Sequence, residues 1–338
     1  MVAGVDPLTA IELSEFADKK GFHTLWLPDH FVDVDGDRTE PWTVLSAIAM
    51  RTRKIRLASS VTDTQRSHPA RTAHAVACLD VISRGRAVLG IGAGEAMNII
   101  PFGLPWDSPR ERVTRLGEAI QVIRSLWMST RSNPTNFSGA YYRLKNAFLS
   151  QPPHQTYPPI YVGAFASRRT LMVAGQLGDG WHSWINTPDT FRRSWNIIQN
   201  AAKSAGRDPT KIDSSTHLMI ANPRDSKEKK LALLSGKVTL LEEKNVLRSL
   251  GYSVELEQYQ HLMVSKQDVQ RVMTSAEQIP DEFVFKTMAI GGSDEIIEKI
   301  EWYARCGVKH LAVLDLLAPK TAKRTMTLFS RIIKKHRF

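Results

Sequence analysis

Residues 86–98 read RAVLGIGAGEAMN, and this stretch decides which fold the rest of the chain has to match. The apolar run predicts a buried strand, and the glycines after it predict a tight turn that leads directly to a carboxylate. A dinucleotide-binding fingerprint requires a third glycine where this chain has Glu95, whose charge would repel a pyrophosphate. The stretch therefore favours either a glycine-rich turn that holds one carboxylate against a ligand or a purely structural bend.

Short β-rich apolar runs alternate with longer helical patterns on both sides of this stretch. Such alternation is typical of βα units and a parallel sheet, and it predicts a (β/α)8 barrel. The expected strands lie within residues 23–30, 54–63, 86–92, 159–164, 178–185, 212–222 and 308–316.

This count gives seven strands, whereas a closed barrel requires eight. The deficit is at the N-terminus, because the chain opens on the helix that should follow the first strand. We therefore expect the first strand to be missing. The barrel should then have a gap with unpaired edges, or another segment should fill that place.

Two segments exceed what a plain barrel needs. Residues 129–158 combine turn residues, alternating aromatic residues and prolines, and they predict an inserted hairpin and loop. Residues 225–280 are charged, poor in glycine and helical in pattern. The sequence thus predicts a single barrel domain, residues 1–338, that carries these two insertions.

The composition narrows the class of protein. A net charge of +11 favours anionic partners. The basic end of the chain, residues 320–338, has apolar residues at helical spacing, so we favour an amphipathic helix there over a nucleic-acid-binding arm.

No apolar run approaches the ~20 residues of a membrane span, and no signal-peptide layout opens the chain. Two distant cysteines predict neither a disulfide framework nor a metal site, and we expect a cytoplasmic protein.

The active site of such a barrel lies at the carboxyl ends of the strands. His30 ends the first predicted strand and titrates near neutrality, which suits proton transfer, although a histidine at a strand end is often only structural. For His182 and Trp184, packing in the barrel is the alternative to a place on the substrate side. The candidates at strand ends are Asp29 and His30, Ser60 to Asp63, Gly92 to Asn98, Gly163 to Phe165, and His182 to Trp184.

At Asp29-His30, Ser60-Val61 and residues 92–98 the sequence resembles the bacterial luciferase-like superfamily, and within it the enzymes that use the deazaflavin coenzyme F420. The resemblance covers nearly the whole chain. The motifs are similar to those of F420-dependent glucose-6-phosphate dehydrogenases and secondary alcohol dehydrogenases. Residues 60–70, SVTDTQRSHPA, are also similar to methylenetetrahydromethanopterin reductase, which usually has aspartate in place of Glu95.

The resemblance implies a barrel that binds the deazaflavin at its C-terminal mouth. A cis peptide bond at Ser60-Val61 would press on one face of the ring, and the positive net charge would suit the phosphate and polyglutamate tail of the coenzyme. The implied coenzyme-binding residues are Asp29, Ser60, Val61, Gly92, Ala93, Gly94, Asn98, Gly163, Ala164 and Phe165.

The resemblance also implies catalytic roles. His30 would take a hydroxyl proton, Glu95 would protonate or stabilise the ring, and Trp42 would support the charge that forms. His182 and Trp184 would face the substrate.

Departures from the family pattern bear on the substrate. The sugar-phosphate enzymes carry basic and hydroxyl residues where this chain has Trp184 and Thr187, and an arginine near Thr287. An alcohol or a methylene-pterin therefore fits better than glucose 6-phosphate. The alternatives are an FMN-dependent luciferase-like monooxygenase and, in another class, a non-catalytic barrel that binds an anion or nucleic acid. We expect a small-molecule substrate and a homodimer, with no nucleic-acid or membrane partner.

Overall fold

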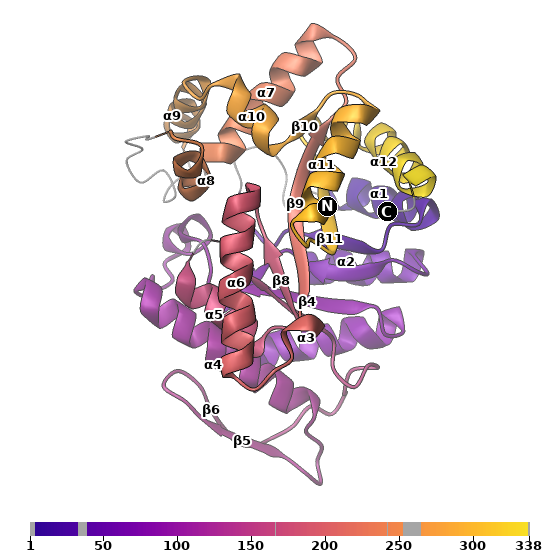
Figure 1. Cartoon of the computed structure of the whole chain (residues 1–338). Coiled ribbons are helices and arrows are strands. Elements are labelled where there is room, and N and C mark those ends of the chain that lie inside the picture. The colour runs from indigo at the N-terminus through magenta and orange to yellow at the C-terminus, as the bar shows by residue number, and fades with distance from the viewer. Residues whose placement is uncertain (1–3, 33–38, 166, 242, 253–264, 337–338) are drawn as a thin grey trace.

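The computed structural model describes residues 4–32, 39–165, 167–241, 243–252 and 265–336 (Figure 1). Its strands are β1 (Thr24–Leu27), β2 (Arg56–Ser59), β3 (Thr62–Asp63), β4 (Ala87–Gly92), β5 (Thr135–Ser138), β6 (Arg143–Ala147), β7 (Ile160–Gly163), β8 (Gly180–Ser183), β9 (Asp213–Ala221), β10 (Ala289–Ile290) and β11 (His310–Asp315). Its α-helices are α1 (Pro7–Lys20), α2 (Pro41–Arg51), α3 (Pro69–Ser83), α4 (Pro109–Trp127), α5 (Arg168–Leu177), α6 (Pro188–Ser204), α7 (Ser226–Leu241), α8 (Lys244–Ser249), α9 (Lys266–Glu277), α10 (Asp281–Thr287), α11 (Ser293–Arg305) and α12 (Ala322–His336).

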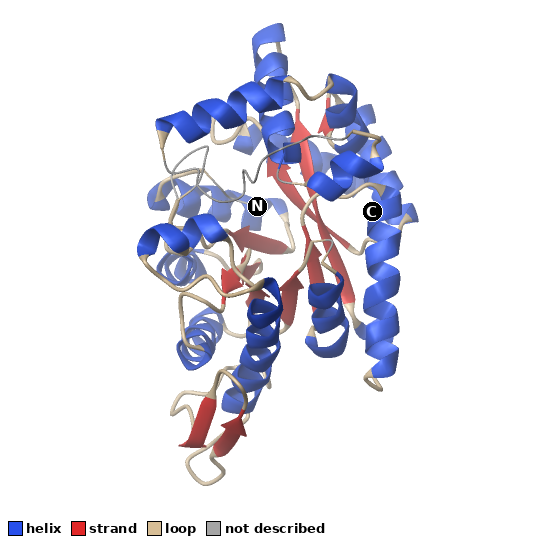
Figure 2. Ribbon diagram, turned by 90° about the vertical axis from the view of Figure 1, so that its left-hand side faces the viewer, coloured by secondary structure: helices blue, strands red, loops and turns tan. Residues whose placement is uncertain are grey.

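A parallel sheet forms the centre of the molecule, and helices surround it (Figure 2). The strand order is β1-β2-β4-β7-β8-β9, and β9 also pairs with both β10 and β11. All seven predicted strands are present, and the two-residue β10, which the sequence analysis did not predict, extends the sheet beside the end of β9. The predicted α/β barrel architecture is thus confirmed.

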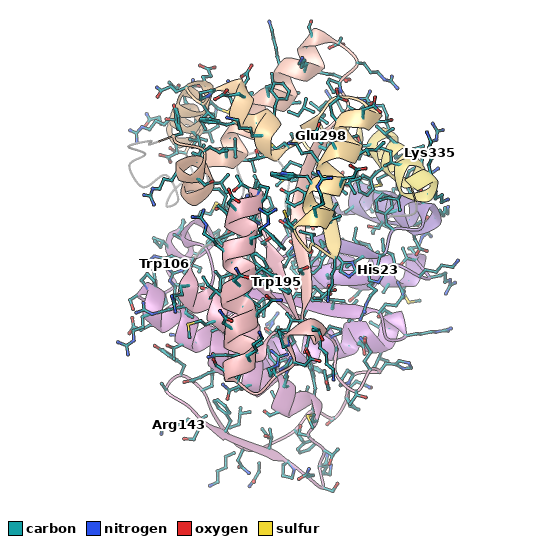
Figure 3. All side chains as sticks on the ribbon, in the orientation of Figure 1. His23, Trp106, Arg143, Trp195, Glu298 and Lys335 are labelled. Carbon is teal, nitrogen blue, oxygen red and sulfur yellow. The ribbon has the colours of Figure 1, made fainter. Side chains whose placement is uncertain are left out.

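The barrel is open between β1 and β11. Within the described residues, β1 pairs only with β2 and β11 pairs only with β9, so the predicted gap with unpaired edges is confirmed. Side chains meet across the opening: His23, labelled in Figure 3, stacks on His310 with ring centroids 5.1 Å apart. Trp26 of β1 and Ala312 of β11 belong to one buried cluster inside the barrel.

Helix capping fixes where the loops of the mouth begin and end. Ser108 accepts a hydrogen bond from the backbone N–H of Glu111, whose carboxylate accepts one from the N–H of Ser108 in return, so α4 starts on a capping box. Helix α1 ends at Gly21, whose φ of 83° favours glycine. Because α4 follows β4, its N-terminus lies on the same side of the barrel as the carboxyl ends of the strands.

Both predicted insertions have the expected secondary structure. Residues 129–158 contain the antiparallel hairpin β5–β6, which projects at the bottom of Figure 1. The carboxylate of Glu118 on α4 accepts three backbone N–H bonds from Ala140, Tyr141 and Tyr142 and so anchors the hairpin. Helices α7–α10 lie together at the top of Figure 1 and bury their own apolar cluster against the end of β9; residues 253–264 lie outside the described part.

The basic C-terminal segment is the amphipathic helix that the sequence predicted. Helix α12 lies against α1, where Ser330 Oγ donates to the carbonyl of Lys20 at 3.0 Å and Phe329 stacks on Phe22. Phe329 and Ile332 are buried, which leaves the lysines exposed. No helix in the described part of the chain is long and apolar enough to cross a membrane.

Candidate active site

The peptide bond between Ser60 and Val61 is cis, as the resemblance implied, and it interrupts the strand between β2 and β3. The Val61 side chain fills the space above two glycines of the neighbouring strands. A Cβ on Gly92 would lie 2.9 Å from Val61 Cγ2, and a Cβ on Gly163 would lie 2.7 Å from the same atom. These distances are too short for any side chain, so both positions require glycine for the close approach of Val61.

Replacing Gly163 by alanine is expected to destabilise the protein by about 1–3 kcal/mol, because the added methyl group overpacks against Val61. The measurement is the free energy of unfolding in urea. In the double variant Gly163→Ala, Val61→Ala most of this loss should be absent, since the shortened side chain vacates the space. Purely additive losses would contradict the packing argument.

His182 lies inside the barrel beneath this interruption. Its Nε2 is 3.1 Å from Ser60 Oγ, its Nδ1 is 3.0 Å from Ser215 Oγ, and its ring stacks on Trp26 at 3.9 Å between centroids. The side chain is buried, and this burial lowers its pKa well below the usual value, so the ring is neutral. This geometry fits the packing alternative: His182 supports Ser60 from the interior.

A second buried histidine, His217, was not singled out in the sequence. Its Nδ1 donates to the carbonyl of Ser183 at 2.9 Å, and its buried Nε2 has no hydrogen-bond partner. The ring lies 4.4 Å from that of Trp184, whose buried indole N–H is also unpartnered. A signal was present, because Ser215 and His217 are two residues apart in β9 and therefore lie on the same face of the strand.

Burial lowers the pKa of His217 to about 3, and this shift predicts acid sensitivity. The unfolded chain takes up a proton near pH 6.5, whereas the folded chain does not, so the stabilisation is complete above pH 6.5 and is lost as the pH falls toward 3. Between pH 7 and pH 5, wild-type protein should lose about 2 kcal/mol more unfolding free energy than His217→Asn. Equal losses in urea titrations at both pH values would contradict this expectation.

Asp29 lies at the end of β1 in a buried network with Arg66 and Asp63. Arg66 Nη2 is 3.0 Å from Asp29 Oδ1 and donates to the backbone carbonyl of Asp29 at 2.7 Å, while Arg66 Nε bonds Asp63. Burial raises the pKa of Asp29 above its ordinary value, and Arg66 opposes that rise. One arginine thus holds two carboxylates from neighbouring strand ends.

His30 and Glu95, predicted from separate strand ends, come together in the fold. His30 Nε2 lies 3.4 Å from Glu95 Oε2. Asn98 explains this meeting, because its Oδ1 accepts hydrogen bonds from the backbone N–H groups of Phe31 at 2.6 Å and Val32 at 3.2 Å. The loop after β4 is thereby joined to the loop after β1.

The remaining predicted residues lie around this pair. Ala164 is buried and its carbonyl accepts from the Trp181 indole at 2.8 Å, while Phe165 is half exposed. Gly94 has a φ of 88°, so Gly92, Ala93 and Gly94 form the turn that leads to Glu95.

Trp42 lies in the first turn of α2 and packs on the main core. Residues 33–38, between His30 and Trp42, lie outside the described part, so a contact of Trp42 with the centre stays a prediction.

Several buried polar atoms at these loops make no hydrogen bond within the described part of the chain. Buried polar groups in native proteins are almost always paired, so such atoms indicate a polar ligand. These atoms include both hydrogen-bond donors and hydrogen-bond acceptors. A flat heteroaromatic ring with carbonyl and imide groups needs partners of both kinds, so the atoms fit a deazaflavin or a flavin. The unpartnered atoms are Thr64 Oγ1, Gln65 Nε2, Glu95 Oε2 and Asn98 Nδ2.

Comparisons with known proteins point to one family. The family described as luciferase-like monooxygenase matches residues 2–310. The phthiodiolone/phenolphthiodiolone dimycocerosates ketoreductase of Mycobacterium bovis (strain BCG / Pasteur 1173P2) is 30% identical over 306 residues, 85% of this chain and 77% of that protein. The F420-dependent glucose-6-phosphate dehydrogenase of Amycolatopsis mediterranei (strain U-32) is 29% identical over 317 residues, 90% of this chain and 87% of that protein.

Solved structures agree on the fold. An F420-dependent secondary alcohol dehydrogenase in complex with an F420-acetone adduct superposes with a TM-score of 0.81 at 24% identity, covering 98% of this chain and 95% of that chain. At this identity the likeness shows the barrel alone. It therefore supports the arrangement of strand ends from which the site is built.

Proposed function

Since this chain belongs to the luciferase-like monooxygenase family, we propose that it is an oxidoreductase that binds coenzyme F420 and exchanges a hydride between it and an organic substrate. The observation that carries the proposal is the His30–Glu95 pair beside the unpartnered amide of Asn98. Similarity to an F420-dependent dehydrogenase at 29% identity favours the deazaflavin over FMN.

Residues of four loops would hold the coenzyme. The deazaflavin, when bound, accepts or returns a hydride. Val61 would support one face of its ring, because the glycines of β4 and β7 let this side chain stand above the strands. The Asn98 amide N–H would donate to a ring carbonyl, since it makes no hydrogen bond to any residue that the structure describes. Ser60, Asp29 and the backbone at Gly163 to Phe165 would complete the site.

His30 would move the substrate proton. Its partly buried imidazole, 3.4 Å from the Glu95 carboxylate, can take a hydroxyl proton at Nε2 while the carboxylate stabilises the resulting cation. The same pair returns the proton to a carbonyl when the reaction runs in reverse. Among the described residues Glu95 Oε2 accepts no hydrogen bond, and the contact given for it is the ionic one with His30.

A neutral alcohol or its carbonyl product is the substrate class that the chain supports best. Thr187 and Thr287, which replace basic residues of the sugar-phosphate enzymes, are buried, and their hydroxyls are bonded to Thr190 and to the carbonyl of Phe283. Neither can bind a phosphate group as a cation would. Trp184 and His217 add unpartnered buried groups to this side of the barrel. A methylene-pterin type of C1 carrier is the second substrate class.

The test is a fluorescence titration of the purified protein with oxidised F420 and, separately, with FMN. Tight binding of F420 alone is expected, followed by reduction of the coenzyme when secondary alcohols are added and no reduction with glucose 6-phosphate. Binding of FMN alone would overturn the proposal in favour of a flavin monooxygenase. Salt-dependent retention on DNA without binding of either coenzyme would favour the non-catalytic alternative. Light scattering on the same samples tests for the proposed homodimer.

A further inference from the structure

Two buried polar atoms lie close together inside the barrel, on the side of β8 and β9. They are His217 Nε2 and Trp184 Nε1, and neither makes a hydrogen bond to a residue that the structure describes. The centroids of the two rings are 4.4 Å apart. Because buried polar groups in native proteins are almost always paired, two such atoms on neighbouring rings indicate a polar ligand.

The two rings lie one layer above His182, toward the mouth of the barrel. His182 of β8 is paired in register with Ser215 of β9, and their side chains meet inside the barrel. Trp184 and His217 follow two residues later, so they point to the same side of the sheet. The His217 ring lies 4.6 Å from that of His182, which in turn contacts Ser60. A ligand at the two rings would therefore lie on the substrate side of the proposed site.

The protein fixes which of the two atoms donates. His217 Nδ1 is 2.9 Å from the carbonyl of Ser183, which can only accept, so the ring proton is on Nδ1 and Nε2 is an acceptor. Burial lowers the pKa of His217 to about 3, so the ring is neutral at physiological pH. Trp184 Nε1 can only donate. One acceptor beside one donor matches a hydroxyl group, whereas a carbonyl oxygen would leave His217 Nε2 unpaired.

The backbone that carries Trp184 is held in place before any ligand binds. Its carbonyl accepts hydrogen bonds from Thr216 Oγ1 at 2.8 Å and from the backbone N–H of His217 at 3.4 Å. The Trp184 side chain also packs against the apolar cluster that α7–α10 bury. A bound hydroxyl would thus meet a donor that is already positioned, which keeps the entropic cost of binding low.

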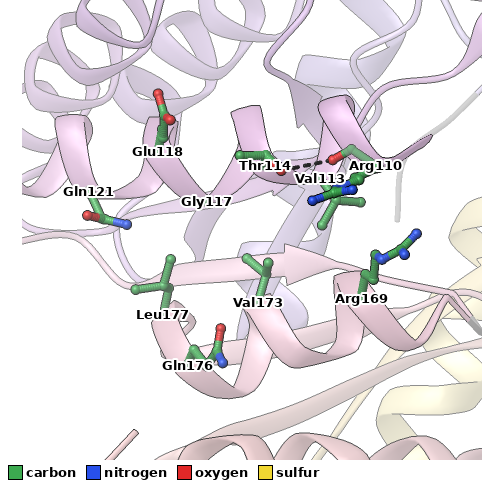
Figure 4. Close-up of a pocket in the computed structure, with 10 residues that line it drawn as sticks. All are labelled: Arg110, Val113, Thr114, Gly117, Glu118, Gln121, Arg169, Val173, Gln176 and Leu177. Atoms are coloured by element: carbon green, nitrogen blue, oxygen red, sulfur yellow. Dashed lines mark hydrogen bonds between the residues drawn. The ribbon is translucent and has the colours of Figure 1, made fainter. Parts of the chain in front are cut away.

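The groove between α4 and α5 is a separate place. It has a volume of about 330 Å³, and its lining side chains come from these two helices alone (Figure 4). A ligand in this groove would leave His217 Nε2 and Trp184 Nε1 without a partner. The group that pairs these two atoms has to lie inside the barrel.

We propose that Trp184 and His217 together bind a hydroxyl group of the substrate that does not itself react, and so select alcohols that carry a second hydroxyl. The inference rests on the proposed function and narrows its substrate class. The Trp184 N–H would donate to the hydroxyl oxygen, and the hydroxyl would donate to His217 Nε2, while the reacting hydroxyl lies at His30. An alcohol without the second hydroxyl would leave two buried groups unpaired, and sites of this kind discriminate strongly against such analogues.

The experiment compares wild type with Trp184→Phe on matched pairs of substrates. Each pair consists of a linear secondary alcohol and the corresponding diol, in a series in which the distance between the two hydroxyls grows by one carbon at a time. In wild type the best diol should have a kcat/KM at least about 100-fold above that of its matched alcohol. In Trp184→Phe this preference should fall by about tenfold, because the substitution removes the N–H and keeps an aromatic ring.

A second readout does not depend on turnover. The NMR signal of the Trp184 indole N–H, identified by its loss in Trp184→Phe, should shift when the best diol is added to the protein with F420 and should not shift with the matched alcohol. Trp302→Phe is the matched control, since Trp302 lies on α11 and packs on Tyr303. This control should keep the wild-type preference for the diol.

Each negative result has a distinct meaning. Equal kcat/KM values for every diol and its matched alcohol in wild type would overturn the inference and leave an internal water as the partner of the two rings. An unchanged preference in Trp184→Phe, or an equal loss in Trp302→Phe, would overturn it as well. If wild type binds no F420, or if neither kind of alcohol reduces it, the proposed function itself fails and the inference fails with it.

Discussion

Replacing His30 by alanine should lower the rate of hydride transfer by about 10²–10⁴-fold, the usual contribution of a general base. The coenzyme should still bind within about threefold, because its proposed contacts are with Val61, Asn98 and the loop after β7. Glu95→Gln should lower the rate in the same direction, since it removes the charge 3.4 Å from the imidazole. Single-turnover absorbance of the deazaflavin with an alcohol measures the rate, and fluorescence titration measures the affinity.

His74→Ala is the control for this experiment, because His74 is an exposed histidine in the middle of α3. The His74→Ala variant should transfer hydride at the wild-type rate. Wild-type rates in both His30→Ala and Glu95→Gln would remove these residues from the mechanism. Loss of binding together with loss of rate would instead place His30 among the coenzyme-binding residues.

Replacing Arg66 by methionine should destabilise the protein by about 3–5 kcal/mol, because two buried carboxylates lose their shared counter-ion. The side chains of Arg66, Asp29 and Asp63 are only 9%, 13% and 6% exposed, so water cannot take over this role. The unfolding free energy in urea measures the loss. At lower pH the loss should shrink, because burial raises the pKa of Asp29 and its protonation removes one of the unpaired charges.

A second set of variants separates charge from packing. The triple variant Arg66→Met, Asp29→Asn, Asp63→Asn should recover part of the stability, because no unpaired charge remains. Arg192→Met breaks the exposed pair with Asp189 and should cost less than about 1 kcal/mol. A loss of that small size in Arg66→Met would show that the Arg66 network contributes little to the fold.

The periodic elements could be predicted from local sequence. The apolar runs predicted seven strands, and the structure contains a strand within each of the seven ranges. The two-residue β10 was not predicted, because a strand this short shows no alternation of polar and apolar residues. It is recognised as a strand by its pairing with β9. The candidate site residues were predicted from the general rule that the active sites of such barrels lie at the carboxyl ends of the strands.

The contacts that make the site were beyond sequence reasoning. His182 was placed on the substrate side, and only the fold shows its two ring nitrogens bonded to Ser60 and Ser215. His217 was overlooked because its environment comes from Ser183 and Trp184 on a different strand. The groove between α4 and α5 likewise depends on how two helices pack on the barrel.

The sequence by itself determined the βα order and the positions after each strand where chemistry can lie, because these depend on periodicity and on turn residues close in the chain. Only the tertiary structure decided that Asn98 ties the loop of His30 to that of Glu95, and that Val61 stands over Gly92 and Gly163. The physical reason is distance along the chain: a hydrogen bond over 67 residues or a methyl group filling the space above a glycine has no local pattern. Such contacts form only when the closing of the sheet brings separate strand ends to one rim.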